Sequence, residues 1–191
     1  GQWKEMERQR KTMEETLETT KTAADATRDA VKLADKTAER QLRAYIAVMS
    51  GEMRVVTLAD GRLAIAIHIE LKNSGQTPGY DFTTWVNWPK ILNKGAVPFG
   101  PPMPIEQRNG TSIIGPGASV HINVTLPVTQ TDLAAIQSGA KNVFVWGGAD
   151  YRDIFEQKRY FIFRDTNAQG HFTSVGNVLA LAPHKLGYEG N

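Results

Sequence analysis

The sequence predicts a mainly β protein with a long N-terminal α-helix, its strands forming an immunoglobulin-like antiparallel β-sandwich. Residues 1–43 hold ten Lys or Arg and nine Asp or Glu, with no Pro and no Gly after Gly1. All 9 Pro and 16 of the 17 Gly follow, and these residues punctuate turns. We therefore expect a helical stalk over 1–43, a β domain over 44–165 and an irregular tail over 166–191.

A heptad pattern runs along the predicted helix. Alternating steps of three and four residues from Trp3 define a seam, as in a coiled coil. At 1.5 Å per residue the helix is roughly 65 Å long, more than a small domain can cover. We predict the apolar and alanine seam positions as partner-binding residues. They are Trp3, Met6, Met13, Leu17, Ala24, Val31, Ala34 and Ala38.

The seam is weak, because Ala and Thr bury little apolar area and Arg10 lies on it. Three interpretations of the helix stay open. It forms a homo-oligomeric coiled coil, it packs on a different protein, or it is a single solvated helix with a charged surface.

From Ala44 onward the apolar residues alternate with a period of two, which is typical of strands. An opening strand is expected over 44–58, bent at Ser50-Gly51, and Asp60-Gly61 is a hairpin turn signal. The clearest strand follows over 62–72, where every second residue is Ile or Leu.

The next segment, 73–79, is predicted as a loop in which Gly75 and Pro78 are structural turn residues. A strand follows over 80–88. Residues 89–117 hold six Pro and five Gly and are expected to form a long irregular connection.

The last part of the β domain contains strands, a short helix and a hairpin. A strand is expected over 118–126, and Thr129 with Asp132 marks the start of a helix of about two turns. Segments 142–153 and 157–163 are predicted to form a hairpin with two apolar faces. Because each predicted strand has an apolar side, two sheets packed face to face would bury them best.

Four sequence pieces carry a resemblance to a known group of proteins. They are Arg43-Ala44-Tyr45-Ile46, the run from Asn73 to Tyr80, Gly115-Pro116-Gly117, and Tyr151-Arg152-Asp153-Ile154-Phe155. In this order they resemble uncharacterised bacterial proteins with an N-terminal membrane helix, a helical stalk and a small β domain. The resemblance covers roughly residues 20–165 and implies a membrane anchor upstream of Trp3, with a weak preference for the cytoplasmic side. It implies no activity.

Carboxylates and tryptophans offer the best candidates for chemistry. Asp150, Asp153 and Glu156 cluster, with Asp81 expected nearby, and such a cluster is a candidate for cation binding or acid–base catalysis. Our preferred role for Asp153 is structural, as an acceptor for turn amides. Trp85, Trp88 and Trp146 are expected to pack in the interior rather than form a sugar-binding platform, and Gly147-Gly148 is interpreted as a turn or bulge.

Other functional classes find little support in the sequence. The net charge is +2, without the basic stripe of a nucleic-acid-binding protein, and there is no Cys. The four His (His68, His121, His171 and His184) show no ligand spacing. Asn109 and Asn123 each begin a glycosylation sequon, but neither sequon is strong evidence for a function. We predict no catalytic residue, cofactor or metal.

These observations favour a non-enzymatic, membrane-anchored or membrane-associated interaction module. Its stalk would mediate homo-oligomerisation or contact a membrane-complex partner, and its β domain would bind protein at a sheet edge or through the 89–117 loop. Two alternatives stay open. One is a ligand-binding domain, for a cation or carbohydrate, or a hydrolytic domain using Asp81, Asp150, Asp153 and Trp146. The other is a structural subunit of a larger membrane complex or filament.

Overall fold

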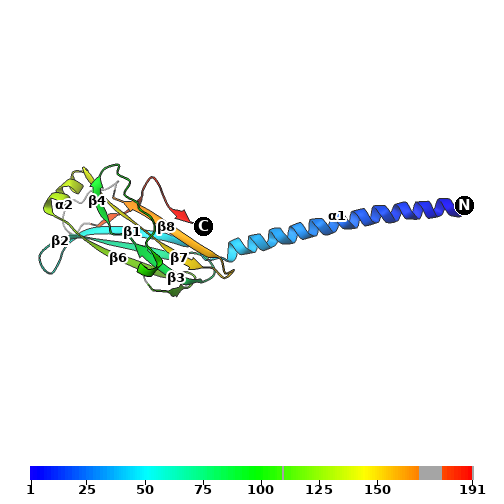
Figure 1. Ribbon diagram of the computed structural model, residues 1–191, viewed down its shortest axis with the longest axis horizontal. Coiled ribbons are helices and arrows are strands. Elements are labelled where there is room, and N and C mark those ends of the chain that lie inside the picture. Colours follow the sequence, from blue (N-terminus) through cyan, green and yellow to red (C-terminus); the bar gives the residue numbers. More distant parts are fainter. Residues whose placement is uncertain (109, 168–177, 191) are drawn as a thin grey trace. The chain divides into compact units, whose positions relative to one another are not determined.

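The computed structural model describes residues 1–108, 110–167 and 178–190 (Figure 1). The chain divides into two compact units, Gly1–Leu42 and Arg43–Asn191. The first is a single helix, α1 (Gln2–Leu42), and the second, the β unit, contains antiparallel strands. The prediction of a mainly β protein with a long N-terminal helix is therefore confirmed.

Helix α1 has 41 residues and buries none of them. The threonine hydroxyls along it donate to the carbonyl four residues earlier, as Thr16 does to Thr12 at 2.8 Å. Arg10 and Glu14 pair at 2.8 Å, one turn apart. Local bonds of this kind contribute a few tenths of a kcal/mol each, so they support a helix but do not replace packing.

One sheet of the β unit has four strands in the order β6-β2-β1-β9. Strands β1 and β2 pair over their full length, with a bulge between Val48 and Ser50 that matches the predicted bend. Gly61, in the connecting turn, has a φ of 83°. The strands are β1 (Ile46–Thr57), β2 (Leu63–Asn73), β6 (Ser119–Pro127) and β9 (Val178–Ala180).

The other sheet follows the order β10-β8-β7-β3-β5, with β4 paired to β7 and β11 paired to β8. Strands β7 and β8 form the predicted hairpin. The strands are β3 (Gly79–Val86), β4 (Lys90–Asn93), β5 (Ser112–Ile114), β7 (Lys141–Arg152), β8 (Lys158–Thr166), β10 (Ala182–Pro183) and β11 (Glu189–Gly190).

Both sheets contribute to one hydrophobic core. Val55, Ile65 and Ile67 come from the four-stranded sheet, and Val145 and Phe163 come from the other. All five are at most 2% exposed. Helix α2 (Gln130–Gln137) adds two buried side chains to this core.

The start of α2 is confirmed by its cap. The Thr129 hydroxyl accepts from the backbone N–H of Asp132 at 3.1 Å, and the Asp132 carboxylate accepts from the backbone N–H of Thr129 at 3.4 Å. This reciprocal pair satisfies two amides that the helix leaves unbonded. Gly139, with a φ of 73°, follows the last turn.

Two segments expected to be irregular contain short strands. The 89–117 connection includes β4, β5 and a 3₁₀ turn at Ile105–Gln107. The described part of the tail includes β9, β10 and β11, each of two or three residues. Such strands are too short to show a period in the sequence, and they form because neighbouring sheets offer free edges.

The interpretation of Gly147-Gly148 as a turn or bulge is wrong, since both lie within β7. A Cβ on Gly147 would lie 2.4 Å from the Trp85 carbonyl oxygen and 2.7 Å from the Phe163 ring. A Cβ on Gly148 would lie 2.9 Å from the Trp85 ring. The rings of Phe163 and Trp85 therefore occupy the space that side chains at Gly147 and Gly148, respectively, would need.

Replacing Gly147 with Ala is expected to destabilise the protein by about 1–3 kcal/mol, because neither the Trp85 backbone nor the buried Phe163 ring can move aside freely. Urea denaturation measures the change. Gly115→Ala is the matched control, since a Cβ there meets nothing within 4 Å. Equal midpoints for the two variants would contradict this explanation.

Candidate functional site

The predicted seam residues all lie exposed on α1. Trp3 is 83% exposed, and Met13 and Leu17 are each 71% exposed. The remaining members, Met6, Ala24, Val31, Ala34 and Ala38, are exposed as well. A shallow hollow of about 400 Å³ on this helix is lined by Met13, Glu14, Thr16, Leu17 and Thr20. Large apolar side chains in this setting are unusual unless another surface covers them.

The predicted turn residue Gly75 allows two backbone segments to approach closely. A Cβ there would lie 2.3 Å from the Arg43 carbonyl oxygen and 2.7 Å from the Tyr45 nitrogen. Pro78 directly precedes β3. Gly75 therefore lies against the segment where the chain enters the β unit, and Pro78 lies where β3 begins.

Asn73 organises this loop, and sequence reasoning missed its role. The side chain is fully buried. Its oxygen accepts from the backbone N–H of Tyr45 at 3.2 Å and of Gly75 at 2.9 Å, and its nitrogen donates to the Thr77 and Ile114 carbonyls. The available signal was an Asn two residues before a Gly, which is typical of an Asx-turn.

Asp153 ties together the turn between β7 and β8. Its buried carboxylate accepts from the backbone N–H of Phe155 at 2.9 Å and of Gln157 at 3.0 Å. The Arg159 guanidinium donates to its other oxygen at 2.8 Å. These bonds engage both oxygens of a carboxylate that is 0% exposed, which supports the structural role expected for Asp153.

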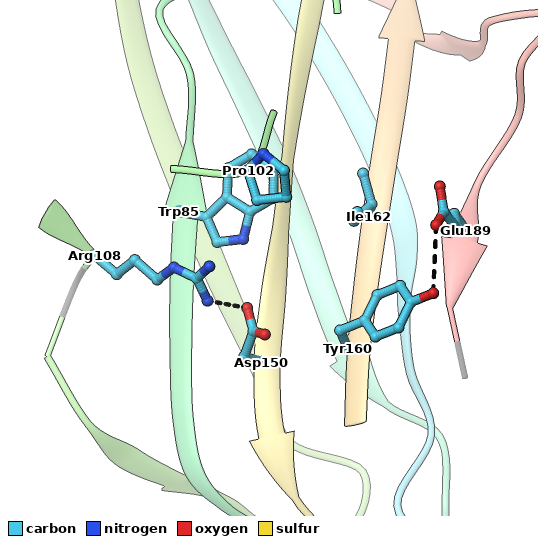
Figure 2. A pocket seen from close by; sticks show the side chains of 7 residues that line it. All are labelled: Trp85, Pro102, Arg108, Asp150, Tyr160, Ile162 and Glu189. Carbon is cyan, nitrogen blue, oxygen red and sulfur yellow. Dashed lines mark hydrogen bonds and ion pairs between the residues drawn. The ribbon is translucent and has the colours of Figure 1, made fainter. Parts of the chain in front are cut away.

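A groove lies on the face of the seven-stranded sheet opposite the core, and we call it the outer groove (Figure 2). Its first cleft has a volume of about 270 Å³. The side chains come from β3, β7, β8, β11 and the 100–108 segment, and they are Trp85, Pro102, Arg108, Asp150, Tyr160, Ile162 and Glu189.

Arg108 and Asp150 form an ion pair, and both residues line this cleft and a second one. The Arg108 side chain is only 9% exposed, its Nε donates to the Met103 carbonyl at 2.9 Å, and its guanidinium lies 5.9 Å from the Trp85 ring. The second cleft, of about 370 Å³, is lined among others by Asp81, Arg152 and Lys158. Arg108 is thus the central wall of the outer groove.

The acidic groups of the outer groove are already paired. Asp150 bonds Arg108, and Asp81 accepts from Arg152 at 2.8 Å. In the first cleft Tyr160 donates to Glu189 at 3.3 Å, as Figure 2 shows. The first cleft combines three apolar side chains, Trp85, Pro102 and Ile162, with acids that are already paired. This combination suits binding of a side chain or peptide better than acid–base chemistry.

The tryptophans do not form a shared platform. Trp85 and Trp146 point to the same face of their sheet but are only 2% and 3% exposed. Phe99 covers Trp146, with ring centroids 5.6 Å apart. The expectation that Trp88 packs in the interior is wrong, because its side chain is 63% exposed. The structure brings Asp81 and Asp150 into one cleft, and neither Asp153 nor Trp146 lines it.

The described histidines lie apart from the outer groove. His68 and His121 stack with centroids 4.9 Å apart on the exposed face of the four-stranded sheet, and His184 lies against Phe99. His171 and Asn109 lie outside the described residues. Within residues 1–108, 110–167 and 178–190, no three His, Asp or Glu gather closely enough to hold a metal ion.

No known protein family, curated protein or solved structure matches this chain. Among the helices that the structure describes, none combines the length and the apolar character needed to cross a membrane.

Asp165 is a second buried acid, 1% exposed, and it lies on β8. Burial raises the pKa of this carboxyl to about 6, although the Tyr188 hydroxyl donates to it at 2.9 Å and lowers the pKa. Burial, and then the contact with Asp165, raise the pKa of Tyr188. Between about pH 4 and pH 6, Asp165 is therefore mostly protonated in the folded state and mostly ionised in the unfolded chain.

Asp153→Ala is expected to destabilise the protein by about 3–5 kcal/mol, because Arg159 and two amides lose a buried partner. Urea denaturation measures this loss of unfolding free energy. Glu52→Ala is the control, since the exposed ion pair of Glu52 with Arg54 contributes less than about 1 kcal/mol to stability. A loss at Asp153 as small as that at Glu52 would contradict the structural role.

Asp165→Asn is expected to become stabilising relative to the native chain as the pH rises. Between pH 4 and 6 the native folded state binds more protons at this site than the unfolded state, so native stability falls there. The loss approaches roughly 3 kcal/mol above pH 7. Denaturation at pH 4 and pH 7.5 gives the difference between variant and native chain, and a pH-independent difference would contradict the assignment.

Proposed function

We propose that this protein is a non-enzymatic interaction module in which α1 mediates self-assembly and the β unit presents a protein-binding surface. The observation that carries the proposal is that α1 buries none of its 41 residues while it exposes large apolar side chains along one seam. An exposed apolar seam gains free energy when another surface covers it, and heptad spacing favours a second helix as that surface.

The outer groove supports the second half of the proposal. Its apolar walls include Pro102 and Ile162, and its acids are engaged by arginines. A partner's side chain could occupy the first cleft, where Asp150 pairs with Arg108 and Tyr160 donates to Glu189. We further propose that the two sheets, which share one core, form an immunoglobulin-like β-sandwich. Membrane association stays a prediction of the resemblance described above.

The intact chain is expected to self-associate and residues 43–191 alone to remain monomeric. The truncated chain keeps the entire core, since α1 contributes no buried residue. Sedimentation equilibrium over a range of concentrations measures both. Circular dichroism and a urea transition confirm that residues 43–191 fold. A monomeric intact chain at every concentration would end the proposal.

A further inference from the structure

The α1 seam is uneven along its length. Its N-terminal half carries the large residues Trp3, Met6 and Leu17, whereas the apolar residues of its C-terminal half are three alanines and Val31. In a parallel pair in register, each residue would meet its own counterpart. Large side chains would then meet large ones at one end and small ones at the other, so no single interhelical distance would fill the seam. Arg10 would also face Arg10 of the second copy, which is unfavourable.

An antiparallel pair removes both problems. When the residues that face each other have numbers adding up to 37, every large seam residue opposes a smaller one. Arg10 then faces a threonine hydroxyl rather than another charge. The facing residues are Trp3 and Ala34, Met6 and Val31, Arg10 and Thr27, Met13 and Ala24, and Leu17 and Thr20.

The charges beside the seam select the same arrangement. One flank carries Glu7 and Glu14 in its N-terminal half and Lys21 and Arg28 in its C-terminal half. In the antiparallel pair, Glu7 approaches Arg28 of the second copy and Glu14 approaches Lys21. Residues directly opposite each other have numbers that add up to 37, whereas the numbers of each charged pair add up to 35. The two members of each charged pair are therefore offset by two residues, about 3 Å along the helix axis.

A parallel pair gains nothing from these charges. There, one flank of each helix would face the opposite flank of the other. The opposite flank of α1 carries no charge, since it consists of Gln2, Gln9, Thr16, Ala23, Ala30 and Thr37. Interhelical ion pairs are therefore available only in the antiparallel orientation.

The single chain leaves some of these groups ready for a second copy. Within the described residues, the side chains of Glu7 and Lys21 make no hydrogen bond or ion pair. Glu14 pairs with Arg10 and Arg28 pairs with Asp25 on the same helix. The hollow lined by Met13, Thr16, Leu17 and Thr20 lies at the centre of the seam, where a coiled coil places a hole for a side chain of the facing helix.

We infer that the occupant of the α1 seam is a second copy of this chain, running antiparallel over Trp3–Ala34. The inference rests on the proposed self-assembly and specifies its partner and orientation. The paired stretch is roughly 48 Å long and spans more than four heptads, which is enough for a coiled coil. Residues 35–42 of each helix lie beyond the overlap.

Cysteine cross-linking of the full chain tests the orientation, since the native sequence contains no Cys. We expect an equimolar mixture of Met13→Cys and Ala24→Cys chains to form a disulfide-linked dimer. Neither variant alone should cross-link beyond background, because neither position faces itself. Efficient self-linking of Ala24→Cys would establish a parallel pair and overturn the inference.

Charge exchange gives an independent readout. One full-length variant carries Glu7→Lys and Glu14→Lys, and another carries Lys21→Glu and Arg28→Glu. Each alone should raise the dissociation constant of self-association about tenfold or more, because four attractions per dimer become repulsions. The mixture should regain native affinity, since every contact is then attractive. Glu15→Lys with Glu18→Lys is the control and should leave the affinity unchanged.

The outcomes separate the two proposals. A monomeric native chain in sedimentation would remove both the self-assembly and its orientation. A native dimer whose exchange variants fail to restore each other would overturn the antiparallel inference and leave self-assembly standing. Restoration by mixing, together with the Met13–Ala24 disulfide, would establish the arrangement.

Discussion

Strand β7 is buried on both of its faces, and this constraint organises the β unit. Val143, Val145 and Ala149 face the shared core, while Phe144 and Trp146 face the other way. Each face needs a cover. The four-stranded sheet covers the first, and Phe99 with His184 covers part of the second. The outer groove exists because this second cover leaves the Asp150 end of β7 partly open.

The same constraint explains the glycine pair in the middle of β7. Trp85 and Phe163 bring rings to opposite faces of one strand, and side chains at Gly147 and Gly148 would occupy the same volume. Arg108 then lies near the Trp85 ring and pairs with Asp150. The packing of the strand and the geometry of the candidate groove are therefore parts of one arrangement.

Periodicity predicted the elements that are long enough to show it. The helix, the 62–72 strand and the 142–163 hairpin all follow from local patterns, and so does the Thr129 cap, because each depends on neighbours in sequence. Strands β4, β5 and β9 to β11 could not be predicted, since they exist only where another strand offers an edge.

The candidate groove was beyond sequence reasoning for a similar reason. Asp81 and Asp150 were noticed as carboxylates, but their neutralisation by Arg152 and Arg108 depends on pairings between distant segments. Asn73 was overlooked because its four hydrogen bonds reach three separate loops and strands. The helix seam was visible because a helix places its own neighbours on one face.

The residues that follow α1 have a mechanical consequence. The Ala44 carbonyl accepts from the Tyr151 hydroxyl at 3.1 Å, and the Tyr45 backbone bonds both Asn73 and Ser74. A pulling force applied at residue 43 would reach β7 through the hydrogen bond of Tyr151. It would reach the end of β2 through the bonds of the Tyr45 backbone. The junction is therefore bonded to both sheets of the β unit and not to β1 alone.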